Sequence, residues 1–156
     1  MNDAQRRAAA VRLLVLDVDG VLTDGRLYFG ADGESMKVFD VRDGHGVRLL
    51  REAGIEVAIL SGRSSPIVDR RAGELGIVRV IQGAADKGGA LASLARELGI
   101  ALEHCAYVGD DWPDLAALAR AAVAAAVADA APEVRRAAHW SSSAPGGRGA
   151  VRELAE

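Results

Sequence analysis

Short apolar runs alternate with helix-like segments along most of this 156-residue sequence. The apolar runs are rich in branched residues and alanine and lie at 13–16, 57–60, 78–81, 105–108 and 123–127. Helical patterns occupy about 43–53, 67–75, 86–98 and 113–121, and the first three end at a glycine. Strands that alternate with helices are typical of parallel strands joined by right-handed crossovers. The sequence therefore predicts an α/β fold with a doubly wound, mainly parallel, Rossmann-like sheet.

Residues 24–40 depart from this alternation. Apolar stretches at 26–29 and 35–39 flank the sequence G-A-D-G, which is typical of a β-hairpin with a glycine-bearing loop. A two-stranded ribbon is marginally stable in water, and this one would expose the side chains of L-Y-F and M-K-V-F. We therefore expect the hairpin to project from the sheet and to mediate oligomerisation.

The length and the 50% hydrophobic content suit one domain, residues 1–156, with a packed core. No insertion is long enough to form a second domain over the sheet. Towards the end of the chain we expect a turn at Pro132 and a possible edge strand at 139–141.

Charge and composition exclude several classes of partner. A net charge of −3 gives no electrostatic reason to expect binding to nucleic acid or to an anionic membrane. A single cysteine, Cys105, cannot form an intramolecular disulfide. The first ten residues lack the apolar core of a secretory signal, and no apolar run approaches the roughly 18 residues of a membrane span. We expect a cytoplasmic protein.

Two carboxylates, Asp17 and Asp19, follow the first apolar run directly and precede a glycine. Residues i and i+2 of a strand share one face, although the turn at Gly20 could redirect Asp19. Two nearby carboxylates repel each other unless a cation or a shared proton lies between them, so the pair indicates a metal site, an acid/base couple, or both. The alternative is that one Asp ends the strand and the other caps a turn.

Polar residues follow other predicted strands as well. Ser61 and Arg63 follow the run at 57–60, and Asp110 and Asp111 follow the run at 105–108. Lys87 lies at the start of the helix expected at 86–98. Because the carboxyl ends of parallel strands meet at one edge of a sheet, these residues should converge on a single crevice.

The segments D-V-D-G-V-L-T-D, V-A-I-L-S-G-R, Lys87 and Y-V-G-D-D-x-x-D resemble, in order and spacing, the four motifs of the haloacid dehalogenase (HAD) superfamily of phosphatases. Over nearly the whole chain the resemblance extends to its small, capless members that dephosphorylate 3-deoxy-D-manno-octulosonate 8-phosphate (KDO 8-phosphate). The further shared features are the D-G-R-L-Y-F hairpin, F-D-V-R-D-G-H-G, A-V-A-D-A and the terminal G-G-R-G-A-V-R-E-L.

The resemblance implies a role for each motif residue. Asp17 would be the nucleophile that forms an aspartyl-phosphate, and Asp19 the general acid and base. Asp110, with Asp17 and the backbone carbonyl of Asp19, would ligate Mg²⁺. Ser61 and Lys87 would bind the transferring phosphoryl group, although Ser61 could be a turn residue and Lys87 a surface lysine.

Two acidic residues near this motif have less certain roles. Asp111 would orient the metal site, and for Asp114 we favour helix capping over direct catalysis.

The substrate carboxylate calls for arginine, which binds carboxylates through two hydrogen bonds. By resemblance, Arg63 and Arg71 match substrate-contacting positions, and arginine at 63 favours the eight-carbon sugar acid. Arg71 could instead be a solvated helix residue. The resemblance also implies a homotetramer with active sites near the subunit interfaces, and a C-terminal tail (143–156) that reaches a neighbouring site. We expect the glycine-rich A-P-G-G-R-G at 144–149 to be a mobile arm in which Arg148 contacts substrate, unless it is an ordinary frayed terminus.

Other functions remain open at this point. One alternative is a phosphatase for a nine-carbon keto-deoxy sugar acid 9-phosphate, of the KDN or N-acylneuraminate type. The others are a non-catalytic binding domain of the same fold and a phosphotransferase or mutase. Intact Asp17, Asp19, Lys87 and Asp110 argue against the binding domain, and the lack of a cap argues against the mutase.

Overall fold

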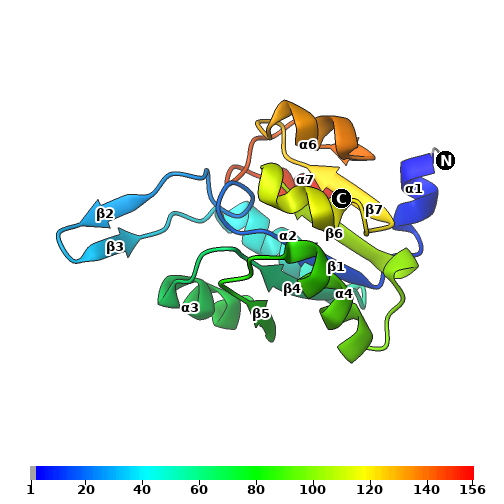
Figure 1. The fold of residues 1–156 in the computed structure, drawn as a ribbon, viewed down its shortest axis with the longest axis horizontal. Helices are drawn as coiled ribbons and strands as arrows, with labels where there is room; N and C mark the ends of the chain where they lie inside the picture. Colours follow the sequence, from blue (N-terminus) through cyan, green and yellow to red (C-terminus); the bar gives the residue numbers. More distant parts are fainter. Residues whose placement is uncertain (1–2) are drawn as a thin grey trace.

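The computed structural model describes residues 3–156 and contains a six-stranded sheet (Figure 1). From one edge to the other, its strands are β5 (Arg79–Ile81), β4 (Glu56–Leu60), β1 (Leu13–Leu16), β6 (Cys105–Gly109), β7 (Val123–Ala126) and β8 (Trp140–Ser141). All neighbouring strands in it are parallel, which confirms the predicted α/β fold. The chain leaves β1 towards β4 and β5 and then returns to the other side of β1, so the carboxyl ends of β1, β4 and β6 lie side by side.

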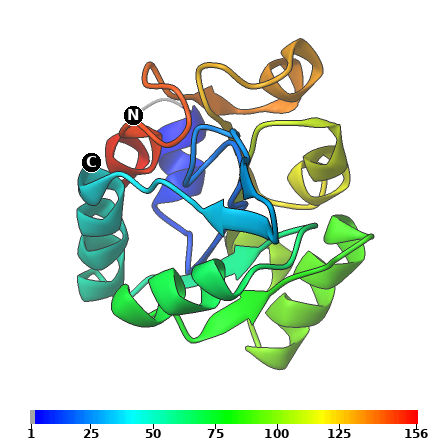
Figure 2. The ribbon, with the colours of Figure 1, turned by 90° about the vertical axis from the view of Figure 1, so that its left-hand side faces the viewer.

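The helices cover both faces of the sheet. They are α1 (Asp3–Ala8), α2 (Val41–Glu52), α3 (Pro66–Glu74), α4 (Lys87–Glu97), α5 (Leu115–Leu118), α6 (Pro132–Ala137) and α7 (Ala150–Ala155), with 3₁₀ turns at Leu102–His104 and Trp112–Asp114. Figure 2 shows α2 and α7 together on one face, and α4 and α5 on the other. None of the helices in residues 3–156 is long and apolar enough to cross a membrane.

Local sequence explains several helix boundaries. The side chains of Asp40, Ser65 and Asp86 accept hydrogen bonds from the first turns of α2, α3 and α4, as expected for N-caps. Gly54 and Gly76 follow the ends of α2 and α3 with positive φ values of 85° and 68°, a conformation that glycine adopts without strain.

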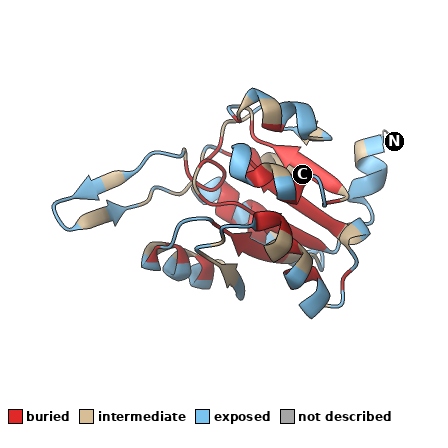
Figure 3. Cartoon of the chain, viewed as in Figure 1, coloured by how far each residue is buried: buried red, intermediate tan, exposed pale blue. Residues whose placement is uncertain are grey.

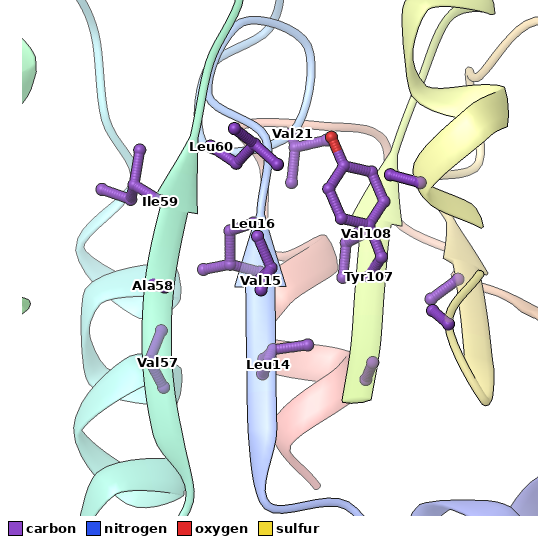
Figure 4. Close-up of a cluster of buried hydrophobic side chains, with 14 of the residues drawn as sticks. Leu14, Val15, Leu16, Val21, Val57, Ala58, Ile59, Leu60, Tyr107 and Val108 are labelled. Carbon is purple, nitrogen blue, oxygen red and sulfur yellow. The ribbon is translucent and has the colours of Figure 1, made fainter. Parts of the chain in front are cut away.

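The core lies in the central strands and the helix faces that contact them (Figure 3). Every residue of β1 is at most 3% exposed, as expected for a strand that is covered on both faces. Val15 of β1 packs in one buried cluster with Ile59 of β4 and Val108 of β6 (Figure 4). The strand that carries Asp17 is therefore held rigidly up to the point where the polar residues begin.

The hairpin is present and projects away from the carboxyl edge of the sheet (Figure 1). Its strands, β2 (Tyr28–Gly30) and β3 (Gly33–Met36), are antiparallel and shorter than expected. The side chains of Phe29 and Met36 are 63% and 51% exposed, so the ribbon presents apolar surface to solvent.

Two expectations for the end of the chain are wrong. Pro132 begins a helix, α6, instead of forming a turn, because proline is well suited to the first helical position. The segment A-P-G-G-R-G is not a free arm, because it folds onto its own chain, where the N–H of Gly147 donates to the carbonyl of Val21 at 2.9 Å. Both carboxylate oxygens of Glu153 accept hydrogen bonds from the backbone N–H of Ser143, at 2.9 Å, and α7 packs along α2 (Figure 2).

Candidate active site

The loop after β1 is a tight turn that carries Asp17 and Asp19. The backbone N–H of Asp17 still pairs with the carbonyl of Val108 at 3.1 Å. The backbone N–H groups of residues 21–23 all donate to the carbonyl of Val18. The hydroxyl of Thr23 accepts hydrogen bonds from two backbone N–H groups, those of Gly20 and Gly25. The carboxylate of Asp17 is thus held at the strand end by a backbone that has few alternative conformations.

Lys87 joins two buried carboxylates at the base of the site. Its Nζ lies 2.9 Å from Oδ1 of Asp17 and 2.8 Å from Oδ1 of Asp114, and all three side chains are at most 7% exposed. Burial, together with the nearby carboxylate of Asp114, raises the pKa of Asp17. Burial opposes the charge of Lys87, but the carboxylates of Asp17 and Asp114 outweigh it and raise the lysine pKa. Lys87 is therefore charged and neutralises part of the negative site.

Asp114 has a larger structural role than capping alone. Its side chain makes no capping hydrogen bond to α5, the helix that it precedes. Its Oδ2 instead accepts hydrogen bonds from the backbone N–H groups of Asp110 and Asp111, at 2.9 and 3.1 Å, and the second of these completes a capping box with Asp111. Its Oδ1 also binds Lys87 and accepts a 2.6 Å hydrogen bond from the hydroxyl of Tyr107. Asp114 thus positions both Lys87 and the backbone of Asp110. The D-D-x-x-D spacing was the sequence signal that pointed to Asp114. The burial of Asp114 could not be predicted from it, because that burial depends on contacts from other segments.

Asp110 completes an acidic cluster. One carboxylate oxygen from each of Asp17, Asp110 and Asp114 lies within 4.8 Å of the others. Burial and the neighbouring charge of Asp17 raise the pKa of Asp110, because like charges cannot both ionise here without a cation. Both carboxylate oxygens of Asp114 are already bonded, Oδ1 to Lys87 and Tyr107 and Oδ2 to two backbone N–H groups. Lys87 bonds only Oδ1 of Asp17, which leaves Asp17 and Asp110 as the candidate ligands. Their hard oxygen atoms fit a Mg²⁺ ion.

A second ionic cluster surrounds Asp19. Lys37, from the end of the hairpin, places Nζ 2.7 Å from Oδ1 of Asp19 and 3.1 Å from Oε2 of Glu34. Arg63 approaches the same two carboxylates at 3.7 and 3.6 Å. The side chain of Lys37 is only 2% exposed, whereas that of Arg63 is 46% exposed. The sequence analysis did not identify Lys37 or Glu34, because only the return of the hairpin brings them to Asp19.

A family model described as haloacid dehalogenase-like hydrolase matches residues 43–122. The KDO 8-phosphate phosphatase KdsC of Yersinia pestis is 44% identical over 155 residues, which cover 99% of this chain and 83% of that protein. The chain belongs to the haloacid dehalogenase-like hydrolase family. The corresponding enzyme of Escherichia coli K12 is 45% identical over 154 residues, covering 99% and 82% of the two chains.

Solved structures of this hydrolase family also match. A KDO 8-phosphate phosphatase from Moraxella catarrhalis, in complex with a magnesium ion, a phosphate ion and KDO, superposes with a TM-score of 0.96. It is 44% identical, and the match covers 99% of this chain and 89% of that one. A probable phosphatase from Pseudomonas syringae has the same TM-score at 48% identity, covering 98% and 87% of the two chains.

The remaining motif residues of this HAD-like hydrolase lie as follows. Ser61 is 2% exposed at the end of β4, and its backbone N–H donates to the carbonyl of Ile81 at 2.8 Å. Asp111 caps the 3₁₀ turn through a 2.8 Å hydrogen bond from the N–H of Trp112. The structure thus brings Asp17, Lys87 and Asp110 together, while Asp19 pairs with Arg63 nearby.

Arg71 and Arg148 make contacts away from the acidic cluster. The guanidinium of Arg71 lies 5.5 Å from the ring centre of Phe39 and contacts Glu74 at 3.4 Å. Its Nε is buried and has no hydrogen-bond partner within residues 3–156. Arg148 is exposed, and its carbonyl accepts a 3.2 Å hydrogen bond from Arg42. Their roles in substrate binding stay predictions.

Proposed function

We propose that this chain is a Mg²⁺-dependent phosphatase that hydrolyses KDO 8-phosphate to KDO and phosphate. The observation that carries the proposal is the match, over 99% of the chain, to a KDO 8-phosphate phosphatase that holds magnesium, phosphate and KDO. The buried cluster of Asp17, Lys87 and Asp110 provides the groups that such a reaction needs. The nine-carbon substrate is not favoured, because the similar curated relatives are named for KDO 8-phosphate.

In the proposed first step, a carboxylate oxygen of Asp17 attacks phosphorus and forms an aspartyl-phosphate. The bond from phosphorus to the sugar oxygen breaks, and Asp19 donates a proton to that oxygen. In the second step Asp19 removes a proton from water, whose oxygen attacks phosphorus and releases phosphate and the carboxylate of Asp17. A magnesium ion held by Asp17, Asp110 and the backbone carbonyl of Asp19 supplies charge neutralisation.

Other residues would bind the substrate during both steps. Lys87 keeps Asp17 oriented and offers positive charge to the phosphoryl oxygens, and the hydroxyl of Ser61 donates to one of them. Arg63 is the best placed cation for the substrate carboxylate, since it is half exposed and adjoins Asp19. Arg71 and Arg148 would take part only if substrate or a neighbouring subunit brings them to the site.

We also propose a homotetramer in which hairpins pack together near the active sites. The support is the exposed apolar surface of the hairpin, where Leu27, Phe29, Met36 and Val38 are 43–63% exposed. Nucleic acid and membrane are not among the proposed partners, and a cytoplasmic location stays a prediction.

The test of the proposed function is phosphate release with Mg²⁺ from KDO 8-phosphate, a nine-carbon sugar acid 9-phosphate and a generic phosphate ester. We expect kcat/KM to be highest for KDO 8-phosphate, and Asp17→Asn to be inactive. Equal values on all three substrates would contradict the specific assignment. No release, with Asp17→Asn behaving identically, would contradict the enzyme assignment.

A further inference from the structure

The C-terminal segment at residues 146–149 packs against the loop that carries Asp17 and Asp19. The backbone N–H of Gly147 donates a 2.9 Å hydrogen bond to the carbonyl of Val21 in that loop. A methyl group on Gly146 would overlap the carbonyl oxygen of Gly20, and one on Gly147 would overlap the backbone of Thr23. Two glycines are therefore required for the segment to approach the catalytic loop so closely.

This segment also contacts residues 129–131, which bind the backbone of the candidate metal ligand Asp110. The N–H of Gly146 donates to Oδ1 of Asp129 at 2.9 Å. Two residues after Asp129, the N–H of Ala131 donates to the carbonyl of Asp110 at 2.7 Å. Gly20 lies between the segment and Asp110, because a methyl group on Gly20 would overlap the Asp110 carboxylate. Gly146 thus contacts the loop of Asp17 and Asp19 directly, and it contacts Asp129 in the segment whose Ala131 binds the backbone of Asp110.

A buried carboxylate, Asp43 of α2, anchors the other end of the segment. Its side chain is among the least exposed polar groups, at 1%, and lies at the start of α7. Oδ2 accepts a hydrogen bond from the N–H of Gly149 at 3.2 Å, and Oδ1 accepts one from the N–H of Arg152 at 3.0 Å. Gly46, one turn along α2, allows the approach, since a Cβ there would lie 2.9 Å from Cα of Arg152.

We propose that residues 146–149 together with Asp43 form a clamp that positions the catalytic loop for phosphoryl transfer. Gly146, Gly147 and Asp43 are then positioning residues that act through Gly20, Val21 and Thr23. In-line attack on phosphorus needs the nucleophile and the proton donor in place together, and displacement by about 1 Å can cost about 100-fold in rate. The clamp thus gives a function to D-G-H-G and G-G-R-G, which the proposed catalytic steps do not use.

The test compares Gly147→Ala with the matched control Gly99→Ala. Both glycines have positive φ, 70° and 64°, so alanine strains the backbone similarly, but only the methyl group at 147 meets the catalytic loop. We expect faster amide hydrogen exchange at residues 18–23 in Gly147→Ala alone. We also expect its kcat on KDO 8-phosphate to fall about 10- to 100-fold with little change in KM. In Gly99→Ala, exchange in the loop and kcat should match the unaltered protein.

Asp43→Asn provides the second variant, which keeps the side-chain shape and loses one of the two acceptors. It should speed exchange at 149–152 and at 18–23 and lower kcat, and it decides the question if Gly147→Ala does not fold. Unchanged exchange at 18–23 and unchanged kcat in either folded variant would overturn the clamp. The kinetic readout rests on the proposed function, but the exchange readout does not. An unaltered protein without phosphatase activity therefore contradicts only the proposed function.

Discussion

Lys87 is the residue on which the electrostatics of the site depend most. It is the cation that lies within 3 Å of both Asp17 and Asp114, in a region closed to solvent. A lysine so placed cannot be replaced by an apolar side chain without leaving two buried carboxylates near each other and near Asp110.

Lys87→Met should therefore lower both stability and activity. We expect the free energy of unfolding to fall by about 3 kcal/mol, because removal of one partner leaves buried charge uncompensated. Phosphate release should be lost as well. Urea denaturation checks the first effect, with Arg96→Met on the exposed side of the same helix as the control. A Lys87→Met protein as stable as Arg96→Met would contradict the expected role.

Substitution of Lys37 should affect Asp19, the proposed general acid and base, more than the stability of the fold. It pairs with Asp19 and Glu34, both of which keep some solvent contact. Lys37→Met should lower kcat, because Asp19 loses its closest partner. We expect a decrease of about 10-fold, which is less than the full contribution of general acid–base catalysis. Lys37→Arg should retain more of the activity. Steady-state kinetics check both variants, and equal kcat values for all three proteins would exclude this role.

Magnesium should stabilise the protein more strongly at higher pH. Burial and neighbouring charge raise the pKa of Asp17 and Asp110 in the metal-free protein, so their stability contribution is present at acidic pH and is lost as pH rises. Magnesium needs the same carboxylates ionised, so its binding offsets the loss. Thermal unfolding in EDTA and in Mg²⁺ from pH 5 to pH 9 should show a growing difference in Tm. A difference that shrinks with rising pH would contradict this account.

At the scale of single elements, local signals sufficed for most of the fold. Apolar runs and terminal glycines located the strands and the main helices, because burial on both faces and the C-terminal glycine are local requirements. The end of the chain was harder. Pro132 suits a turn and a helix start equally well, and the position of α7 depends on Asp43, more than 100 residues earlier. Tertiary contacts of this kind leave no periodic signal.

The site shows the same division. The ends of predicted strands are followed by Asp17, Asp19, Ser61 and Asp110, and Lys87 lies at the start of a predicted helix. The parallel topology therefore places these residues together. Lys37 belongs to a hairpin whose return path no local pattern specifies. Asp114 resembled the cap of the helix that follows it, but its side chain bonds Lys87, Tyr107 and the backbone before the helix instead, and these contacts depend on how β6 and α4 pack.

The hairpin is the element whose exposed surface most needs a partner. We expect the double variant Phe29→Ser and Met36→Ser to dissociate the proposed tetramer, since both side chains are more than half exposed in the isolated chain. Light scattering measures the mass in solution. Val78→Ser is the control, because Val78 is also apolar and exposed (80%) but lies outside the hairpin. It should leave the assembly intact. A monomeric unaltered protein at micromolar concentration would contradict the tetramer.

On the scale of the whole molecule, the sheet brings distant segments to one edge. Residues 17–19 and 61–63, Lys87 and residues 110–114 meet there because β4, β1 and β6 are neighbours and parallel. The hairpin adds Lys37, and the C-terminal segment contacts the loop that carries Asp17 and Asp19 through the hydrogen bond from Gly147 to Val21. Segments far apart in the sequence thus converge around Asp17, the proposed nucleophile.

In the proposed mechanism, Asp17 carries the phosphoryl group during turnover of KDO 8-phosphate. The most direct measurement is acid quenching of the enzyme with KDO 8-phosphate and Mg²⁺, followed by borohydride reduction and peptide mass spectrometry. Borohydride reduces acyl phosphates and leaves free carboxylates unchanged. We predict reduction at Asp17, dependent on substrate and absent from Asp17→Asn. Steady phosphate release with no reduction at Asp17, or with reduction at another carboxylate, would contradict the account.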